Sequence, residues 1–162
     1  TDTRIASRAD MKNKRQYGSS FLEPELSDAV VGCLFDIRNK YGRFHRERVY
    51  DRVLDEHLNA RSISFLDKPR IKIYSLDTGI CIATYVPDKL VAGKILLDLK
   101  AQPMASREEE LRAHEYVRAS EYQILYFVNF GEEQFKPRRF IFTNDRKPFL
   151  ALRASKDESV YP

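Results

Sequence analysis

The spacing of apolar residues predicts two amphipathic helices in the first third of the chain. From Glu25 to about Tyr41 apolar side chains recur every three or four positions, and Gly42 follows as a C-terminal cap. The same spacing returns from about Arg46 to Ala60. Each pattern places its apolar residues on one face of a helix, so both helices are expected to pack against a common core.

Strand patterns dominate the rest of the chain. Alternation or short apolar runs between turn residues predict strands over residues 71–76, 80–86, 94–101, 122–130 and 137–143. Residues 85–101 form two short strands that turn at Ala92-Gly93. Ser106 and Glu109 form a capping box that starts a third helix, from about Arg107 to Ser120. The order strand, helix, strand over residues 94–130 is typical of a crossover between parallel strands.

These elements predict an α/β (α+β) fold with a central mixed sheet of about five strands flanked by helices. The first two helices are expected to cover one face of that sheet. We expect a flexible N-terminal arm over residues 1–21 and a single domain over residues 22–162, and the part that follows Asn144 is expected to be peripheral.

Charged residues stand at positions where the pattern predicts burial. Asp98 and Lys100 lie two apart on an apolar strand and therefore share one face. Glu47 precedes Tyr50 by three positions and so lies at the inward edge of the second helix. A buried carboxylate is costly unless a metal ion, an ion pair or water compensates it. Pairing of Asp98 with Lys100, or of Glu47 with the helix dipole or a nearby arginine, would suffice without any catalytic role.

The arrangement of these residues resembles the GxxExxY proteins of the PD-(D/E)XK nuclease-like superfamily, from roughly Leu26 to Thr143. Pro87-Asp88 followed by Asp98-Leu99-Lys100 matches the superfamily signature. The resemblance implies a restriction-endonuclease-like core and a nuclease that hydrolyses phosphodiester bonds in DNA with Mg²⁺ or Mn²⁺. The implied metal ligands are Asp88, Asp98, the Leu99 carbonyl and Glu47, and these carboxylates would act in catalysis together with Lys100.

Two positions depart from the related motifs. Phe44 replaces the glycine that gives GxxExxY its name, although Glu47 is kept. Arg112 stands where related helicase-nuclease proteins have the glutamine of a Gln-x-x-x-Tyr motif, and Tyr116 is retained. A cation near a metal ion weakens metal binding by repulsion. These departures favour the alternative of a catalytically impaired nuclease fold that binds nucleic acid or a protein partner.

Composition is compatible with a nucleic-acid partner without requiring one. The chain has 162 residues, 43% hydrophobic and 32% charged, with a net charge of +4 and a pI near 9.0. Basic residues cluster near the predicted site and again over residues 136–147, and each cluster is either a phosphate-binding surface or simply a solvated face. The candidate nucleic-acid-binding residues are Arg43, Arg46, Arg48, Arg112 and Tyr116.

Other function classes find little support in the sequence. Cys33 and Cys81 have no zinc-ligand spacing and suit a reducing, cytoplasmic location. No apolar run is long enough to span a bilayer, so no membrane association is expected. The sequence leaves open the choice between DNA and RNA, the choice between end and internal attack, and the oligomeric state.

Overall fold

The structure is a computed structural model that describes residues 22–154. The predicted N-terminal arm over residues 1–21 lies outside the described residues. In chain order the elements are α2 (Pro24–Tyr41), α3 (Glu47–Ala60), β1 (Phe65–Asp67), β2 (Ile71–Tyr74), β3 (Cys81–Tyr85), β4 (Lys89–Val91), β5 (Ile95–Lys100), α4 (Arg107–Arg118), β6 (Ile124–Asn129), β7 (Arg138–Ile141), η2 (Asn144–Arg146) and α5 (Phe149–Ala154).

The central sheet contains five strands in the order β1-β4-β5-β6-β7. β5 and β6 are parallel, in register from Ile95 opposite Ile124 to Lys100 opposite Asn129, and α4 connects them. The other neighbouring strands are antiparallel. The predicted mixed sheet, the predicted crossover and the capping role of Ser106, which accepts a hydrogen bond from the Glu109 N–H, are confirmed.

The membership of the sheet differs from the prediction at one edge. β2 and β3 form a separate antiparallel hairpin, while β1 and β4 complete the central sheet. β1 and β4 have three residues each, which is too short to show an alternation in the sequence. The sequence therefore indicated the hairpin clearly but gave no signal for β1.

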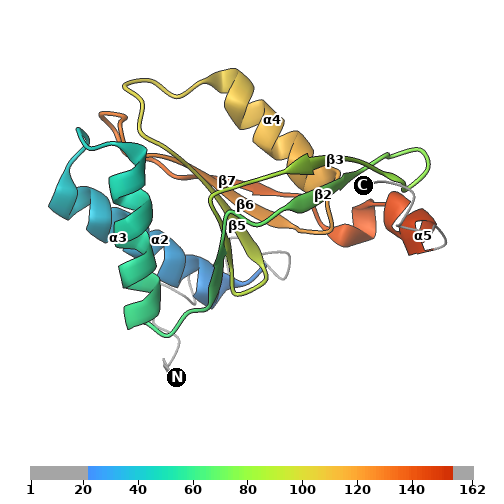
Figure 1. Cartoon of the computed structure of the whole chain (residues 1–162), viewed down its shortest axis with the longest axis horizontal. Helices are drawn as coiled ribbons and strands as arrows, with labels where there is room; N and C mark the ends of the chain where they lie inside the picture. Colours follow the sequence, from blue (N-terminus) through green and yellow to red (C-terminus); the bar gives the residue numbers. More distant parts are fainter. Residues whose placement is uncertain (1–21, 155–162) are drawn as a thin grey trace.

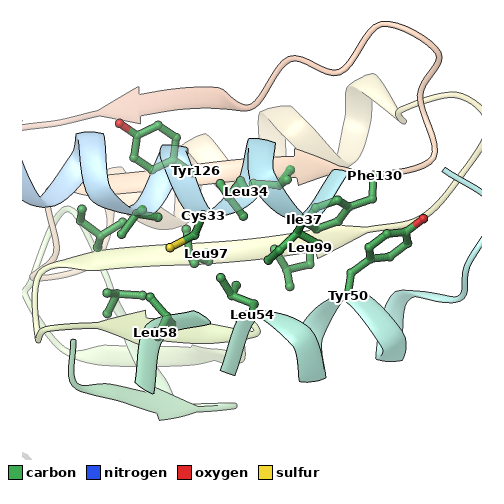
Figure 2. Packing of buried hydrophobic residues seen from close by; sticks show 14 of the residues in the cluster. Cys33, Leu34, Ile37, Tyr50, Leu54, Leu58, Leu97, Leu99, Tyr126 and Phe130 are labelled. Atoms are coloured by element: carbon green, nitrogen blue, oxygen red, sulfur yellow. The ribbon is translucent and has the colours of Figure 1, made fainter. Parts of the chain in front are cut away.

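Two apolar layers cover the sheet (Figure 1). On one face α2 and α3 pack against β5 and β6, as predicted. Figure 2 shows the side chains that meet in this layer, among them Leu34, Ile37, Leu54, Leu58, Leu97 and Leu99. On the other face α4 and the hairpin contact Leu96 and Phe127. Because side chains alternate along β5, Asp98 and Lys100 point to the α4 side.

The C-terminal part of the described chain is packed more tightly than the sequence indicated. Phe149 of α5 is only 1% exposed and joins Tyr74 and Cys81 in a small cluster under the hairpin. Lys147 is buried and donates hydrogen bonds to the carbonyls of Ser120 and Tyr122 at 2.8 and 2.6 Å. The expectation of a peripheral segment after Asn144 was therefore wrong, because one aromatic ring and one buried ammonium dock it.

The helices between residues 22 and 154 are all too short or too polar to cross a lipid bilayer.

Candidate active site

The four charged residues singled out in the sequence line one cleft. Glu47 comes from the start of α3, Asp88 from the link between β3 and β4, and Asp98 and Lys100 from the end of β5. The cleft has a volume of about 390 Å³ and lies between α3, α4 and the hairpin. Its remaining lining residues are Lys68, Tyr85, Val86, Glu109, Arg112, Ala113 and Tyr116.

Backbone contacts fix the Asp88 carboxylate beside β5. The Asp88 N–H donates to the Leu97 carbonyl at 2.9 Å, and the Leu99 N–H donates to Asp88 Oδ2 at 2.6 Å. The N–H and C=O of one strand residue point to the same side, so the Leu99 carbonyl also faces the Asp88 side. The Lys100 carbonyl points the other way and accepts from the Phe130 N–H at 2.8 Å.

Asp98 is bordered by a phenol and an ammonium. The Tyr85 hydroxyl donates to Asp98 Oδ2 at 2.5 Å, and Lys100 Nζ lies 3.6 Å from Asp98 Oδ1. Tyr116 stacks on the Tyr85 ring with the ring centroids 4.3 Å apart. Burial raises the pKa of Asp98, the Tyr85 and Lys100 contacts lower it in part, and the Asp88 charge adds to the rise.

The charges in the cleft also shift the pKa values of Glu47 and Lys100. Burial raises the pKa of Glu47, and the charges of Asp88 and Asp98 raise it further. Burial alone would lower the pKa of Lys100, but Asp98, Glu109 and Glu47 outweigh it, so the pKa lies above its usual value. Lys100 is therefore an ammonium next to carboxylates that repel one another.

Tyr50 sets the position from which Glu47 enters the cleft. Its hydroxyl donates to the Gly42 carbonyl at 2.6 Å and accepts from the His45 N–H at 3.2 Å. Its ring stacks on Phe130 with centroids 4.3 Å apart and planes 2° from parallel. Gly42 itself has a φ of 73°, which favours glycine. The loop before α3 is thus anchored to the end of β6, close to the strand that carries Lys100.

The types of donor in the cleft suit a hard divalent cation, although among the described residues only Asp51, Asp55 and Asp67 bring three carboxylate oxygens within 4.8 Å of one another. Three carboxylates line the cleft; burial raises the pKa of Glu47 and of Asp98, and the charge of Asp88 adds to both rises, so a cation between these carboxylates would be favourable. Oxygen donors of this kind suit Mg²⁺ or Mn²⁺ and not Zn²⁺. The described residues contain no cysteine or histidine in this cleft.

A family model for the PD-(D/E)XK nuclease superfamily matches residues 24–140, which includes every element that lines the cleft. The chain belongs to the PD-(D/E)XK nuclease superfamily. Neither the curated proteins nor the solved structures gave a match. Membership indicates a nuclease fold whose relatives generally use divalent metal ions and act on nucleic acid.

A second cluster of acidic residues, outside the cleft, surrounds a buried lysine. One oxygen each of Asp51, Asp55 and Asp67 lies within 4.8 Å of the others. Lys89, with no exposed surface, places Nζ 2.6, 2.5 and 2.9 Å from these three carboxylates. We assign this cluster a structural role, because the Lys89 ammonium already compensates the charge of the three carboxylates.

The predicted nucleic-acid-binding residues lie in different places. Arg112 and Tyr116 line the cleft, and Tyr116 is half-buried against Tyr85. Arg48 lines a neighbouring hollow on α3. Arg46 is exposed at the start of that helix.

Arg43 lies over the ring of Phe44, 5.0 Å from its centroid. Phe44 is 88% exposed, so the side chain that replaces the motif glycine points away from the core.

The second basic cluster is largely taken up by structural contacts. Lys147 is buried on two carbonyls, Arg138 pairs with Glu110 at 2.6 Å, and Arg139 donates to the Leu22 carbonyl at 3.1 Å. The buried ammonium of Lys147 is therefore not available to bind a phosphate. Of the basic sequence candidates for nucleic-acid binding, Arg112 lines the cleft and Arg48 lines the neighbouring hollow.

Sequence reasoning missed Lys68, Tyr85 and Glu109 as members of the site. Tyr85 stands on the inward face of β3, and that alternation was the one signal available for it. Glu109 was recognised only as part of a capping box. Lys68 lies in a loop with a φ of 50°, and no periodic pattern points to it.

Proposed function

We propose that this chain is a divalent-metal-dependent nuclease that hydrolyses phosphodiester bonds in DNA. The observation that carries the proposal is the convergence of Glu47, Asp88, Asp98 and Lys100, from three separate parts of the chain, in one cleft. Mg²⁺ or Mn²⁺, when bound, would polarise the phosphate and lower the pKa of a water molecule.

We assign Asp88 and Asp98 as the principal ligands, with the Leu99 carbonyl and Glu47 completing the set. Asp88 is held by the Leu99 N–H and Asp98 by Tyr85, so both carboxylates are oriented by groups outside the ligand set. Glu47 enters from the opposite side, on the first turn of α3. All of these residues line the same cleft or border it on β5.

Lys100 is the catalytic lysine in this proposal. Its ammonium lies 3.6 Å from Asp98 and is half-buried, which places a fixed positive charge beside the ligands. There it would hold the attacking water and stabilise the negative charge that develops on the phosphate. Arg112, on the α4 side of the cleft, would bind a phosphate oxygen.

DNA would approach across the start of α3 and the outer side of α4. Arg43, Arg46, Arg48 and Arg112 offer positive charge there, and Tyr116 offers a ring edge at the cleft. Contacts of this type bind the backbone and are mostly blind to sequence.

Within the superfamily we propose a GxxExxY-type protein. Glu47 and Tyr50 of that motif have distinct places in this structure: Glu47 faces the cleft, and Tyr50 anchors the loop before α3. We also propose that residues 22–162 form a single domain. The buried free thiols of Cys33 and Cys81 support a cytoplasmic location.

A second candidate function is favoured by Arg112. This cation lines the same cleft as the proposed ligands, where it opposes a metal ion. The chain would then be a nuclease fold that binds nucleic acid or a protein partner without cutting.

A cleavage assay separates the two functions. Purified protein is incubated with labelled single- and double-stranded DNA in Mg²⁺, in Mn²⁺ or in chelator, for the wild type and for Asp98→Asn. Asp77→Asn, at an exposed acid in the turn between β2 and β3, is the matched control. We expect metal-dependent cleavage by the wild type and the control, and a loss of at least about a hundredfold in Asp98→Asn.

Cleavage that survives Asp98→Asn unchanged would contradict the site assignment. Metal-independent DNA binding with no cleavage by any variant would favour the second function. An RNA substrate run in parallel decides between the two nucleic acids.

A further inference from the structure

Lys68 links the proposed metal site to the acidic group behind it. It lies in the loop between β1 and β2, and its N–H donates to the Asp88 carbonyl at 2.9 Å. Its ammonium lies 2.8 Å from Asp88 Oδ1 and 3.1 Å from Asp51 Oδ2. One cation therefore bridges a proposed metal ligand and a carboxylate that faces a different hollow.

The contact with Asp88 involves the oxygen that a metal ion would need. Asp88 Oδ2 already accepts the hydrogen bond from the Leu99 N–H at 2.6 Å. Oδ1 is the oxygen left for a cation, and the Lys68 ammonium is bonded to it. A divalent ion that binds Asp88 through Oδ1 has to compete with Lys68 for the same oxygen and is also repelled by its charge.

Asp51 provides a second place for the displaced ammonium. Its Oδ1 is held by the buried Lys89 at 2.6 Å, which leaves Oδ2 directed at Lys68. Asp67 Oδ1 lies 4.0 Å from the same ammonium. The Lys68 side chain is 49% exposed, so it can change partner without leaving water or disturbing the core.

We propose that Lys68 is a displaceable counter-ion of the metal site, which neutralises Asp88 and moves onto Asp51 and Asp67 when a divalent ion binds. It acts through Asp88 without contacting the ion, and it lowers the affinity of the site for metal. The Lys89 cluster has a matching role, because it fixes the carboxylate that receives Lys68. This inference rests on the proposed function, since it takes Asp88 to be a metal ligand.

Metal affinity tests the proposal without a cleavage assay. The full chain is stripped of metal and titrated with Mn²⁺, and the free ion is followed by electron paramagnetic resonance. The variants are Lys68→Met and the charge-preserving Lys68→Arg. The matched control is Lys94→Met, because Lys94 is also a half-exposed lysine, 56% exposed and paired with Glu23 at 3.1 Å.

We expect Lys68→Met to bind Mn²⁺ about tenfold more tightly than the wild type, because one hydrogen bond to a charged group no longer opposes the ion. Lys68→Arg and Lys94→Met should bind like the wild type. Should Lys68→Met fail to fold by circular dichroism, Lys68→Gln replaces it with the same expectation.

Equal or weaker Mn²⁺ binding by the uncharged variants would overturn the proposal and make Lys68 a group that orients Asp88 for the ion. Titration of the Asp98→Asn variant shows whether only the role of Lys68 is wrong or the proposed metal site is wrong as well. If Asp98→Asn abolishes Mn²⁺ binding while Lys68→Met leaves it unchanged, the role of Lys68 alone is wrong. If neither the wild type nor any Lys68 variant binds Mn²⁺, the proposed function and the counter-ion role are both wrong.

Discussion

At the scale of single residues, the Tyr85 hydroxyl opposes the effect of burial on the Asp98 carboxylate. Its hydrogen bond to Oδ2 favours the ionised carboxylate and so offsets part of the rise in pKa that burial causes. Tyr116 stacks on the other side of this link and keeps the Tyr85 ring in place. A side chain that touches neither phosphate nor metal thus controls the protonation of a proposed ligand.

Replacement of Tyr85 by phenylalanine tests this control. Without the hydroxyl the pKa of Asp98 rises, and the proton competes with the metal up to a higher pH. We expect Tyr85→Phe to lose Mn²⁺ binding at a higher pH than the wild type as the solution is acidified. At the upper end of the pH range, where the carboxyl is ionised in both proteins, the two affinities should converge. The measurement is a series of Mn²⁺ titrations at steps of decreasing pH, starting from about pH 8.

Tyr126→Phe is the control, because Tyr126 is buried in the core on the α2 side of the sheet. It should leave the pH dependence unchanged. An acid limit for Mn²⁺ binding that is identical in Tyr85→Phe and the wild type would mean that the phenol has only a packing role.

At the scale of elements, the buried Lys89 joins three pieces of secondary structure. Its ammonium is bonded to Asp51 and Asp55 of α3 and to Asp67 of β1, while Lys89 itself begins β4. Burial lowers the pKa of Lys89, but the hydrogen bonds to these carboxylates raise it above its usual value. Removal of the cation would leave the largely buried Asp51 beside Asp55 and Asp67 without the ammonium that compensates their charges.

We therefore expect Lys89→Met to lower the free energy of unfolding by about 3–5 kcal/mol, the usual cost of breaking a buried ion pair on one side. Urea denaturation followed by circular dichroism measures the loss. Lys94→Met, which removes an exposed pair with Glu23, should change stability by less than about 1 kcal/mol. A similar small change in Lys89→Met would show that the acidic group tolerates the loss of its ammonium.

The sequence predicted those parts of the site that depend on periodicity. Asp98 and Lys100 follow from the two-residue repeat of a strand, and Glu47 follows from its place at the edge of a helical stripe. Whether they meet, and with which partners, depends on tertiary contacts. Lys68 and Lys89 were missed for that reason, since the carboxylates to which each lysine donates hydrogen bonds lie at least 17 positions away along the chain.

The same distinction holds for the fold. The two helices, the crossover and the turn at Ala92-Gly93 have strong local patterns, and the structure has all of them. β1 and the docking of α5 depend on partners that come from elsewhere in the chain. The three residues of β1 form a strand only because β4 lies beside them.

At the scale of the whole molecule, the distribution of charge matters more than the net value of +4. The cleft concentrates carboxylates, which repel a phosphate backbone, while Arg112 lines it from α4 and the exposed Arg46 and Arg48 lie at the start of α3. Under the proposed function, DNA binding would draw on the surrounding basic residues, and a divalent ion would offset the acids in the centre. This explains why a modest basic excess is compatible with a nucleic-acid partner.

The salt dependence of DNA affinity measures how many of these arginines contact phosphate. Each phosphate contact adds about 0.9 to the magnitude of the slope of log Kobs against log salt for duplex DNA. In an Asp98→Asn background, which should not cut, we expect Arg46→Ala, Arg48→Ala and Arg112→Ala each to reduce that magnitude by about 0.9. Fluorescence anisotropy over a range of KCl concentrations, with Ca²⁺ present throughout, gives the slopes.

Arg118→Ala is the matched control, because Arg118 is an exposed arginine at the last residue of α4 that pairs with Glu115 and does not line the cleft. Its slope should equal that of the parent variant. If Arg118→Ala lowers the slope as much as Arg112→Ala does, the positive charge acts as a diffuse field and DNA has no defined path across the cleft. If only the three arginines near the cleft change it, the backbone runs over the start of α3 and along α4, which brings a phosphate to Lys100.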